Sequence, residues 1–137
     1  MVTIHTIYRG ELRCDATHGP SRSKLTTDAP VDNHGKGESF SPTDLLATAL
    51  GTCMVTVMGI RARAGGWDID GTTVEVRKHM VAQPTRRVGK LEVVLHVRGQ
   101  HAPDARAALE AAGHGCPVLA SLHPDVEVAV SFHWEGA

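Results

Sequence analysis

The chain has 137 residues, with 14 Lys and Arg against 15 Asp and Glu, so its formal net charge at pH 7 is −1. General nucleic-acid binders carry a strongly basic total or patch, so this balance disfavours that class. A hydrophobic share of 42% and a charged share of 21% are typical of a globular domain and exclude a disordered chain. The length predicts one domain over residues 1–137, and an aromatic share of 4% predicts a core of aliphatic side chains.

The first forty residues predict an opening β-meander followed by a polar loop. Residues 2–17 mix apolar side chains with Thr, His and charged residues, and a turn separates them from a short strand at 24–27. Residues 28–39 are rich in Asp, Gly, Asn and Pro and lack a regular pattern. A loop of this length indicates a functional role.

A long helix is predicted to begin at Ser41 and to end at Gly65-Gly66. Ser41 is a favourable N-cap, Pro42 is tolerated at the first helical position, and Asp44 suits the positive end of the helix dipole. Pairs of apolar residues recur at every fourth position, namely Leu45, Leu46, Ala49, Leu50, Cys53, Met54, Val57 and Met58. The other side carries mostly small residues, so we expect a buried helix that is approached closely from both sides.

The second half of the chain predicts two strands, two short helices and a final strand. The expected elements are strands at 72–80 and 91–97 with a hairpin loop at 83–90, helices at 103–112 and 116–122, and a strand at 125–134. This order, with no internal repeat, predicts an α+β fold.

The chain contains three cysteines, Cys14, Cys53 and Cys116. The odd number argues against a secreted disulfide scaffold, and the N-terminus lacks the basic start and apolar block of an export signal. No apolar run approaches the ~20 residues of a membrane span. We therefore expect a cytosolic protein without a membrane partner, with its cysteines mostly reduced.

Each cysteine admits a structural and a chemical interpretation. Cys53, on the apolar stripe, suits either a small core residue or a reactive thiol, and the residues alone leave both open. Cys116 follows a Gly-His-Gly turn and precedes Pro117 at a predicted helix start, where backbone N–H groups lower the pKa of a thiol. Cys14 lies on a predicted strand without a motif, so we expect it in the core.

Other catalytic chemistries lack their motifs in this chain. The nine His include no H-x-x-x-H pair, and no C-x-x-C occurs, so neither a zinc site nor a cofactor is expected. No G-x-S-x-G elbow of a serine hydrolase is present. The glycine-rich stretch 34–38 lacks the Lys-Ser/Thr ending of a phosphate-binding loop.

Two motifs together resemble a known family. The run Ser41-Pro42-Thr43-Asp44-Leu45-Leu46 precedes Cys53 by seven residues. Far downstream lies Gly115-Cys116-Pro117-Val118, whose cysteine is 63 residues after Cys53. This arrangement is similar to the OsmC/Ohr superfamily, the osmotically inducible protein C and organic hydroperoxide resistance proteins. The resemblance covers nearly the whole chain. It implies an OsmC-like α+β fold in which antiparallel sheets wrap a long central helix in an intertwined homodimer.

The resemblance also implies a thiol-dependent peroxidase. By motif, Cys53 corresponds to the peroxidatic residue, which attacks a small organic hydroperoxide or hydrogen peroxide and becomes a sulfenic acid. Cys116 corresponds to the resolving residue, which forms a disulfide with it. The family's reductant is a dithiol, such as a lipoylated protein.

Such chemistry needs a cation, because burial on an apolar stripe disfavours a thiolate. The family supplies an arginine from the first hairpin, and the best match is Arg22 in Pro20-Ser21-Arg22-Ser23-Lys24. Arg13 and Lys24 are alternatives for the same role.

The carboxylate that orients this arginine departs from the family pattern. The family's peroxidases carry a Glu ten residues before the reactive cysteine, and Thr43 occupies that position here. Asp44 is adjacent but turned ~100° away on a helix, and Glu38 lies in the preceding loop. The chain is therefore expected to belong to a divergent OsmC-like branch. A non-catalytic dimer that binds a small apolar or thiol ligand in its interface pocket is the alternative function.

Overall fold

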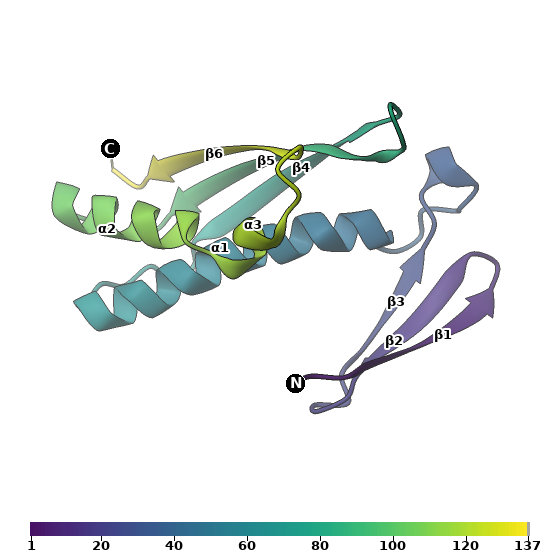
Figure 1. Cartoon of the computed structure of the whole chain (residues 1–137). Helices are drawn as coiled ribbons and strands as arrows, with labels where there is room; N and C mark the ends of the chain where they lie inside the picture. Colours follow the sequence, from purple (N-terminus) through teal and green to yellow (C-terminus); the bar gives the residue numbers. More distant parts are fainter. Residues whose placement is uncertain (137) are drawn as a thin grey trace. The chain divides into compact units, whose positions relative to one another are not determined.

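The computed structural model describes residues 1–136, which form two compact units, Met1–Leu46 and the chain from Ala47 onward. The first unit is a three-stranded antiparallel sheet in the order β1-β2-β3, and a short 3-10 helix follows it (Figure 1). Its elements are β1 (Ile4–Gly10), β2 (Arg13–His18), β3 (Lys24–Asp28) and η1 (Val31–Asn33). The predicted meander and the loop after it are confirmed.

The second unit packs helices on one face of a second three-stranded sheet, ordered β4-β5-β6 (Figure 1). Helix α1 (Pro42–Gly65) begins in the first unit and continues into the second. The remaining elements are β4 (Thr73–Val81), β5 (Arg87–Val97), α2 (Pro103–His114), α3 (Pro117–Ser121) and β6 (Glu127–Trp134). The mixed α+β class is confirmed, whereas one domain over residues 1–137 stays a prediction.

The second sheet corrects two sequence predictions. Strands β4 and β5 pair antiparallel, but β5 and β6 pair parallel, so the sheets are not both antiparallel as expected. The chain leaves β5 at its C-terminal end, passes back through α2 and α3, and starts β6 beside the N-terminal part of β5. Such a crossover makes the two neighbouring strands parallel. The hairpin loop is also shorter than predicted, because β5 already begins at Arg87.

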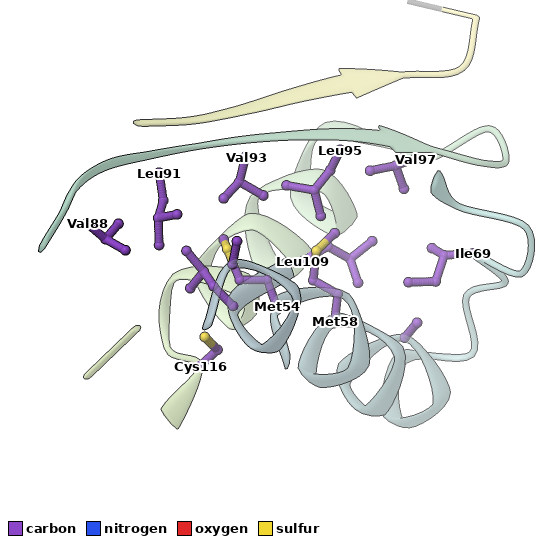
Figure 2. Close-up of a cluster of buried hydrophobic side chains, with 13 residues drawn as sticks. Met54, Met58, Ile69, Val88, Leu91, Val93, Leu95, Val97, Leu109 and Cys116 are labelled. Atoms are coloured by element: carbon purple, nitrogen blue, oxygen red, sulfur yellow. The ribbon is translucent and has the colours of Figure 1, made fainter. Parts of the chain in front are cut away.

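The core of the second unit lies between its sheet and its helices. Figure 2 shows the apolar side chains of β5 facing Met54 and Met58 of α1 and Leu109 of α2. The residues of this core with at most 1% exposure are Leu50, Met54, Met58, Leu91, Val93, Leu95, Val97, Leu109 and Cys116. The outward side chains of β4 and β6 are exposed at alternate positions, as a half-buried sheet requires.

Helix α1 is buried along one face within this chain. Its buried residues are Ala47, Leu50, Gly51, Met54, Met58 and Ala62. The other side carries the exposed residues Thr52, Thr56 and Ile60. The single chain therefore does not bury α1 from both sides in the way that the sequence predicted.

By length and composition alone, α1 could cross a membrane, with a mean hydropathy of 1.6 over 18 residues. The expectation that no apolar run is long enough did not anticipate α1, whose apolar residues are interspersed with Thr48, Gly51 and Thr52. Core helices of soluble proteins share the same length and composition, and α1 supplies Leu50, Met54 and Met58 to the core, each with 0% exposure.

Candidate functional site

Cys53 lies in the middle of α1, whose start is fixed by a reciprocal capping arrangement. The Ser41 hydroxyl accepts the backbone N–H of Asp44 at 3.1 Å, and the Asp44 carboxylate accepts the backbone N–H of Ser41 at 2.9 Å. Asp44, a candidate for orienting the arginine, thus caps the helix. Cys53 is half-buried and packs against the apolar core, one position before the fully buried Met54.

Cys116 is the N-cap residue of α3 and is completely buried, with 0% exposure. Its Sγ accepts the backbone N–H of Leu119 at 3.3 Å, and Pro117 occupies the first helical position. The predicted helix start is therefore confirmed. Figure 2 places Cys116 at the margin of the buried cluster, on the helix side of the sheet.

The second unit brings the two predicted cysteines together. The side chain of Cys53 lies near enough to the Cys116 thiol to influence its pKa, and both cysteines are free. Burial raises the pKa of the Cys116 thiol above its ordinary value, and the neighbouring Cys53 side chain raises it further. The N–H of Leu119 opposes this change but contributes less than burial. The helix-start argument for a lowered pKa at Cys116 is therefore wrong in direction.

Arg22 lies in the turn between β2 and β3, in the first unit. Its backbone adopts a left-handed conformation with φ of 65°, and its N–H donates to the carbonyl of His18 at 2.8 Å. The side chain is exposed, and among residues 1–136 no carboxylate forms an ion pair with it.

Glu38, in the same unit, does pair with an arginine, but the arginine is Arg13. Arg13 Nη1 lies 3.1 Å from Glu38 Oε2 and 3.5 Å from Asp28 Oδ2. Arg13 begins β2 directly opposite Asp28 in β3, so the sheet register brings this pair together.

Asp28 is the residue of this group that the sequence analysis missed. It was placed in the polar loop, whereas it ends β3 and is 1% exposed. A buried ionisable residue requires partners, and a strand register that pairs residue 13 with residue 28 would have indicated the burial of Asp28.

Among residues 1–136, no group of three His, Cys, Asp or Glu side chains is arranged to hold a metal ion.

Comparisons with known proteins agree on one family. A sequence profile described as OsmC-like protein matches residues 35–131. A Psychrobacter arcticus 273-4 structure, named provisionally as an osmotic stress induced and detoxification response protein, is 45% identical, with a TM-score of 0.91 over 97% of this chain and 96% of that one. No protein of curated function gives a significant match.

More distant structures share the fold. An organic hydroperoxide resistance protein OsmC from Legionella pneumophila has a TM-score of 0.78 at 17% identity, covering 97% of this chain and 96% of that one. An organic hydroperoxide resistance protein from Elizabethkingia anophelis has a TM-score of 0.78 at 14% identity, covering 98% and 96%. At these identities the likeness establishes fold alone.

Proposed function

The chain belongs to the OsmC-like family, and from that premise we propose that it is a thiol-dependent peroxidase acting on small organic hydroperoxides or hydrogen peroxide. The observation that carries the proposal is the pairing of two free cysteines from distant parts of the sequence, Cys53 on α1 and Cys116 at the start of α3. Relatives named for organic hydroperoxide resistance support the substrate class.

In the first step, the thiolate of Cys53 attacks one peroxide oxygen. An S–O bond forms and the O–O bond breaks; the departing alkoxide takes up a proton and leaves as an alcohol, while Cys53 becomes a sulfenic acid. In the second step the Cys116 sulfur attacks that sulfur. An S–S bond forms, the S–O bond breaks, and the hydroxyl leaves with one proton as water.

The cycle closes when a dithiol reduces the disulfide and is itself oxidised to a disulfide. A lipoylated protein is one carrier of such a dithiol. Both oxidising equivalents pass through cysteine sulfur, so the proposal includes no cofactor. The proposed setting is the cytosol, where thiols are kept reduced.

We propose that the working form is the intertwined homodimer implied by the family. Large apolar side chains of the first unit are exposed, with Ile4 at 60%, Ile7 at 57% and Tyr8 at 63%. Ile4 and Tyr8 lie on the same face of β1, where exposed large apolar side chains suit an interface with a partner. A second copy that covers these residues and the open side of α1 would also supply the two-sided burial predicted for that helix.

The test is stopped-flow consumption of cumene hydroperoxide by the full-length protein with dithiothreitol as reductant. We expect Cys53→Ser to abolish turnover and the matched variant Cys14→Ser to retain it. Turnover by Cys53→Ser at the wild-type rate would overturn the mechanism. If the wild type consumes no hydroperoxide, the non-catalytic ligand-binding alternative replaces this proposal.

A further inference from the structure

Two histidines from distant parts of the sequence lie side by side on the second sheet. His96 of β5 and His133 of β6 are register partners in the parallel pairing of these strands. Their rings are stacked, with centroids 4.9 Å apart and an angle of 22° between the ring planes. This separation matches the spacing of neighbouring strands, about 4.8 Å, so the two rings stand directly beside each other.

The histidine pair faces away from the helices. Side chains alternate between the two faces of a strand, and Leu95 and Val97, the neighbours of His96, belong to the buried core (Figure 2). Both histidines are exposed on the opposite face. Because Cys53 packs against the core, the histidine pair is separate from the proposed cysteine chemistry.

The ring nitrogens of both histidines are free to bind a ligand. Among residues 1–136, neither ring takes part in a hydrogen bond or an ion pair, and the rings contact only each other. For comparison, His79 contacts Glu92 at 2.6 Å, and His101 contacts a backbone carbonyl at 2.8 Å. A neutral imidazole has one nitrogen without a hydrogen, and this nitrogen is a common metal ligand. The pair therefore presents two such nitrogens on one surface.

The charges next to the pair do not oppose a bound cation. Two residues beyond the histidines on each strand, Arg98 and Glu135 form an ion pair with each other at 3.4 Å. Thr73, the antiparallel partner of His96 on β4, is uncharged. The charges of these neighbours therefore sum to zero.

We propose that His96 and His133 together bind one first-row divalent transition-metal ion that prefers imidazole ligands, namely Ni²⁺, Cu²⁺ or Zn²⁺. A metal–nitrogen bond is about 2.0–2.1 Å long, so the two bound nitrogens can be at most about 4.2 Å apart. Each side chain is exposed and has two rotatable bonds, so rotation of both rings brings their nitrogens within this distance. Water completes the coordination, which distinguishes this site from a structural zinc site with four protein ligands.

The test is isothermal titration calorimetry of the reduced full-length protein with NiCl₂ at pH 7.5. Ni²⁺ is the probe because Cu²⁺ would oxidise the thiols. We expect His96→Gln and His133→Gln each to weaken Ni²⁺ binding by at least about tenfold, because the second imidazole binds within the same molecule. The double variant should bind Ni²⁺ about as weakly as either single variant, since a lone imidazole has only the affinity of any other exposed histidine.

The matched control is His123→Gln. His123 is also exposed, but its Nδ1 accepts the backbone N–H of Asp125 at 3.0 Å. This variant should bind Ni²⁺ within about twofold of the wild type. A second measurement needs no variant: in proton NMR spectra of the wild type, less than one equivalent of paramagnetic Ni²⁺ should broaden the Hε1 resonances of His96 and His133 together, before those of the other histidines.

Three results would overturn the inference. They are a wild-type Kd for Ni²⁺ above about 1 mM, an unchanged affinity in either single variant, and broadening of only one of the two resonances. Ni²⁺ bound to cysteine thiols would remain in the double variant at wild-type affinity, which also counts against the histidine site. Far-UV circular dichroism checks that each variant is folded, and the NMR measurement carries the test if one is not.

Discussion

Helix α1 packs closely against strand β4 at Gly51, two residues before Cys53. A Cβ atom added at Gly51 would lie 2.6 Å from Cγ2 of Val76 and 3.2 Å from Cγ1 of Val74. Ordinary contacts begin at 3.4 Å, so the substitution Gly51→Ala requires a displacement of about 0.8 Å between the helix and the strand. Both valines are fixed in the β4–β5 ladder, opposite Val93 and Leu95.

The stability of Gly51→Ala reflects two opposing effects. Forcing a methyl group into a packed contact costs about 1–3 kcal/mol. Alanine in a helix interior is favoured over glycine by about 1 kcal/mol. The expected net loss in the free energy of unfolding is therefore about 1 kcal/mol, although alanine is the better helix former.

Urea unfolding followed by circular dichroism measures this loss, at one fixed protein concentration because a dimer's stability depends on concentration. The control is the double variant Gly51→Ala with Val76→Ala, which removes the methyl group that the new Cβ would meet. We expect the double variant to be about 1 kcal/mol more stable than the sum of the two single losses predicts. Additive losses, or a Gly51→Ala variant more stable than the wild type, would refute the close approach as the cause.

Three further predictions concern the core and the cysteines. Because burial raises the pKa of Cys116, the folded state holds this proton more tightly than the unfolded state, so stability should fall as pH rises above about 9. Urea midpoints measured between pH 8 and 10 should therefore fall less steeply in Cys116→Ala than in the wild type. Equal slopes would contradict this prediction. Leu109→Ala, at a residue with 0% exposure, should lower the free energy of unfolding by about 2–5 kcal/mol in urea unfolding, and a loss below about 1 kcal/mol would contradict its core position. One equivalent of hydroperoxide should lower the mass of the wild type by about 2 Da, because a Cys53–Cys116 disulfide forms. The same treatment should raise the mass of Cys116→Ser by about 16 Da, because the Cys53 sulfenic acid is not resolved. A wild-type mass that stays constant would remove the resolving role of Cys116.

The local elements of this fold could be predicted because their signals are local. The Ser41 cap and the double glycine delimit α1 at nearly the predicted residues, and the alternation of Val126, Val128 and Val130 marks β6. The direction in which β6 pairs was not predictable in the same way. It depends on the path of the chain through α2 and α3, which no local pattern records.

The same difference separates the cysteine pair of the second unit from the ion-pair cluster of Arg13, Asp28 and Glu38 in the first unit. Cys53 and Cys116 were found because each lies in a recognisable motif, and the structure brings them together. Asp28 was missed because its partner, Arg13, is set by the register between β2 and β3 rather than by sequence proximity. In the sequence, Asp28 resembles the other polar residues of the loop, and only its burial distinguishes it.

The environments of the two cysteines indicate which of them reacts first in the proposed cycle. The raised pKa of Cys116 keeps it a protonated thiol near neutral pH, which makes it a poor first nucleophile towards a peroxide. In the second step, however, the leaving hydroxyl needs a proton to depart as water, and the Cys116 thiol holds one beside Cys53. The proton that makes Cys116 a poor first nucleophile is thus the one that leaves with the hydroxyl as water when the Cys116 sulfur forms the S–S bond. In the proposed cycle, Cys53, half-buried on α1, is therefore the residue that meets the peroxide.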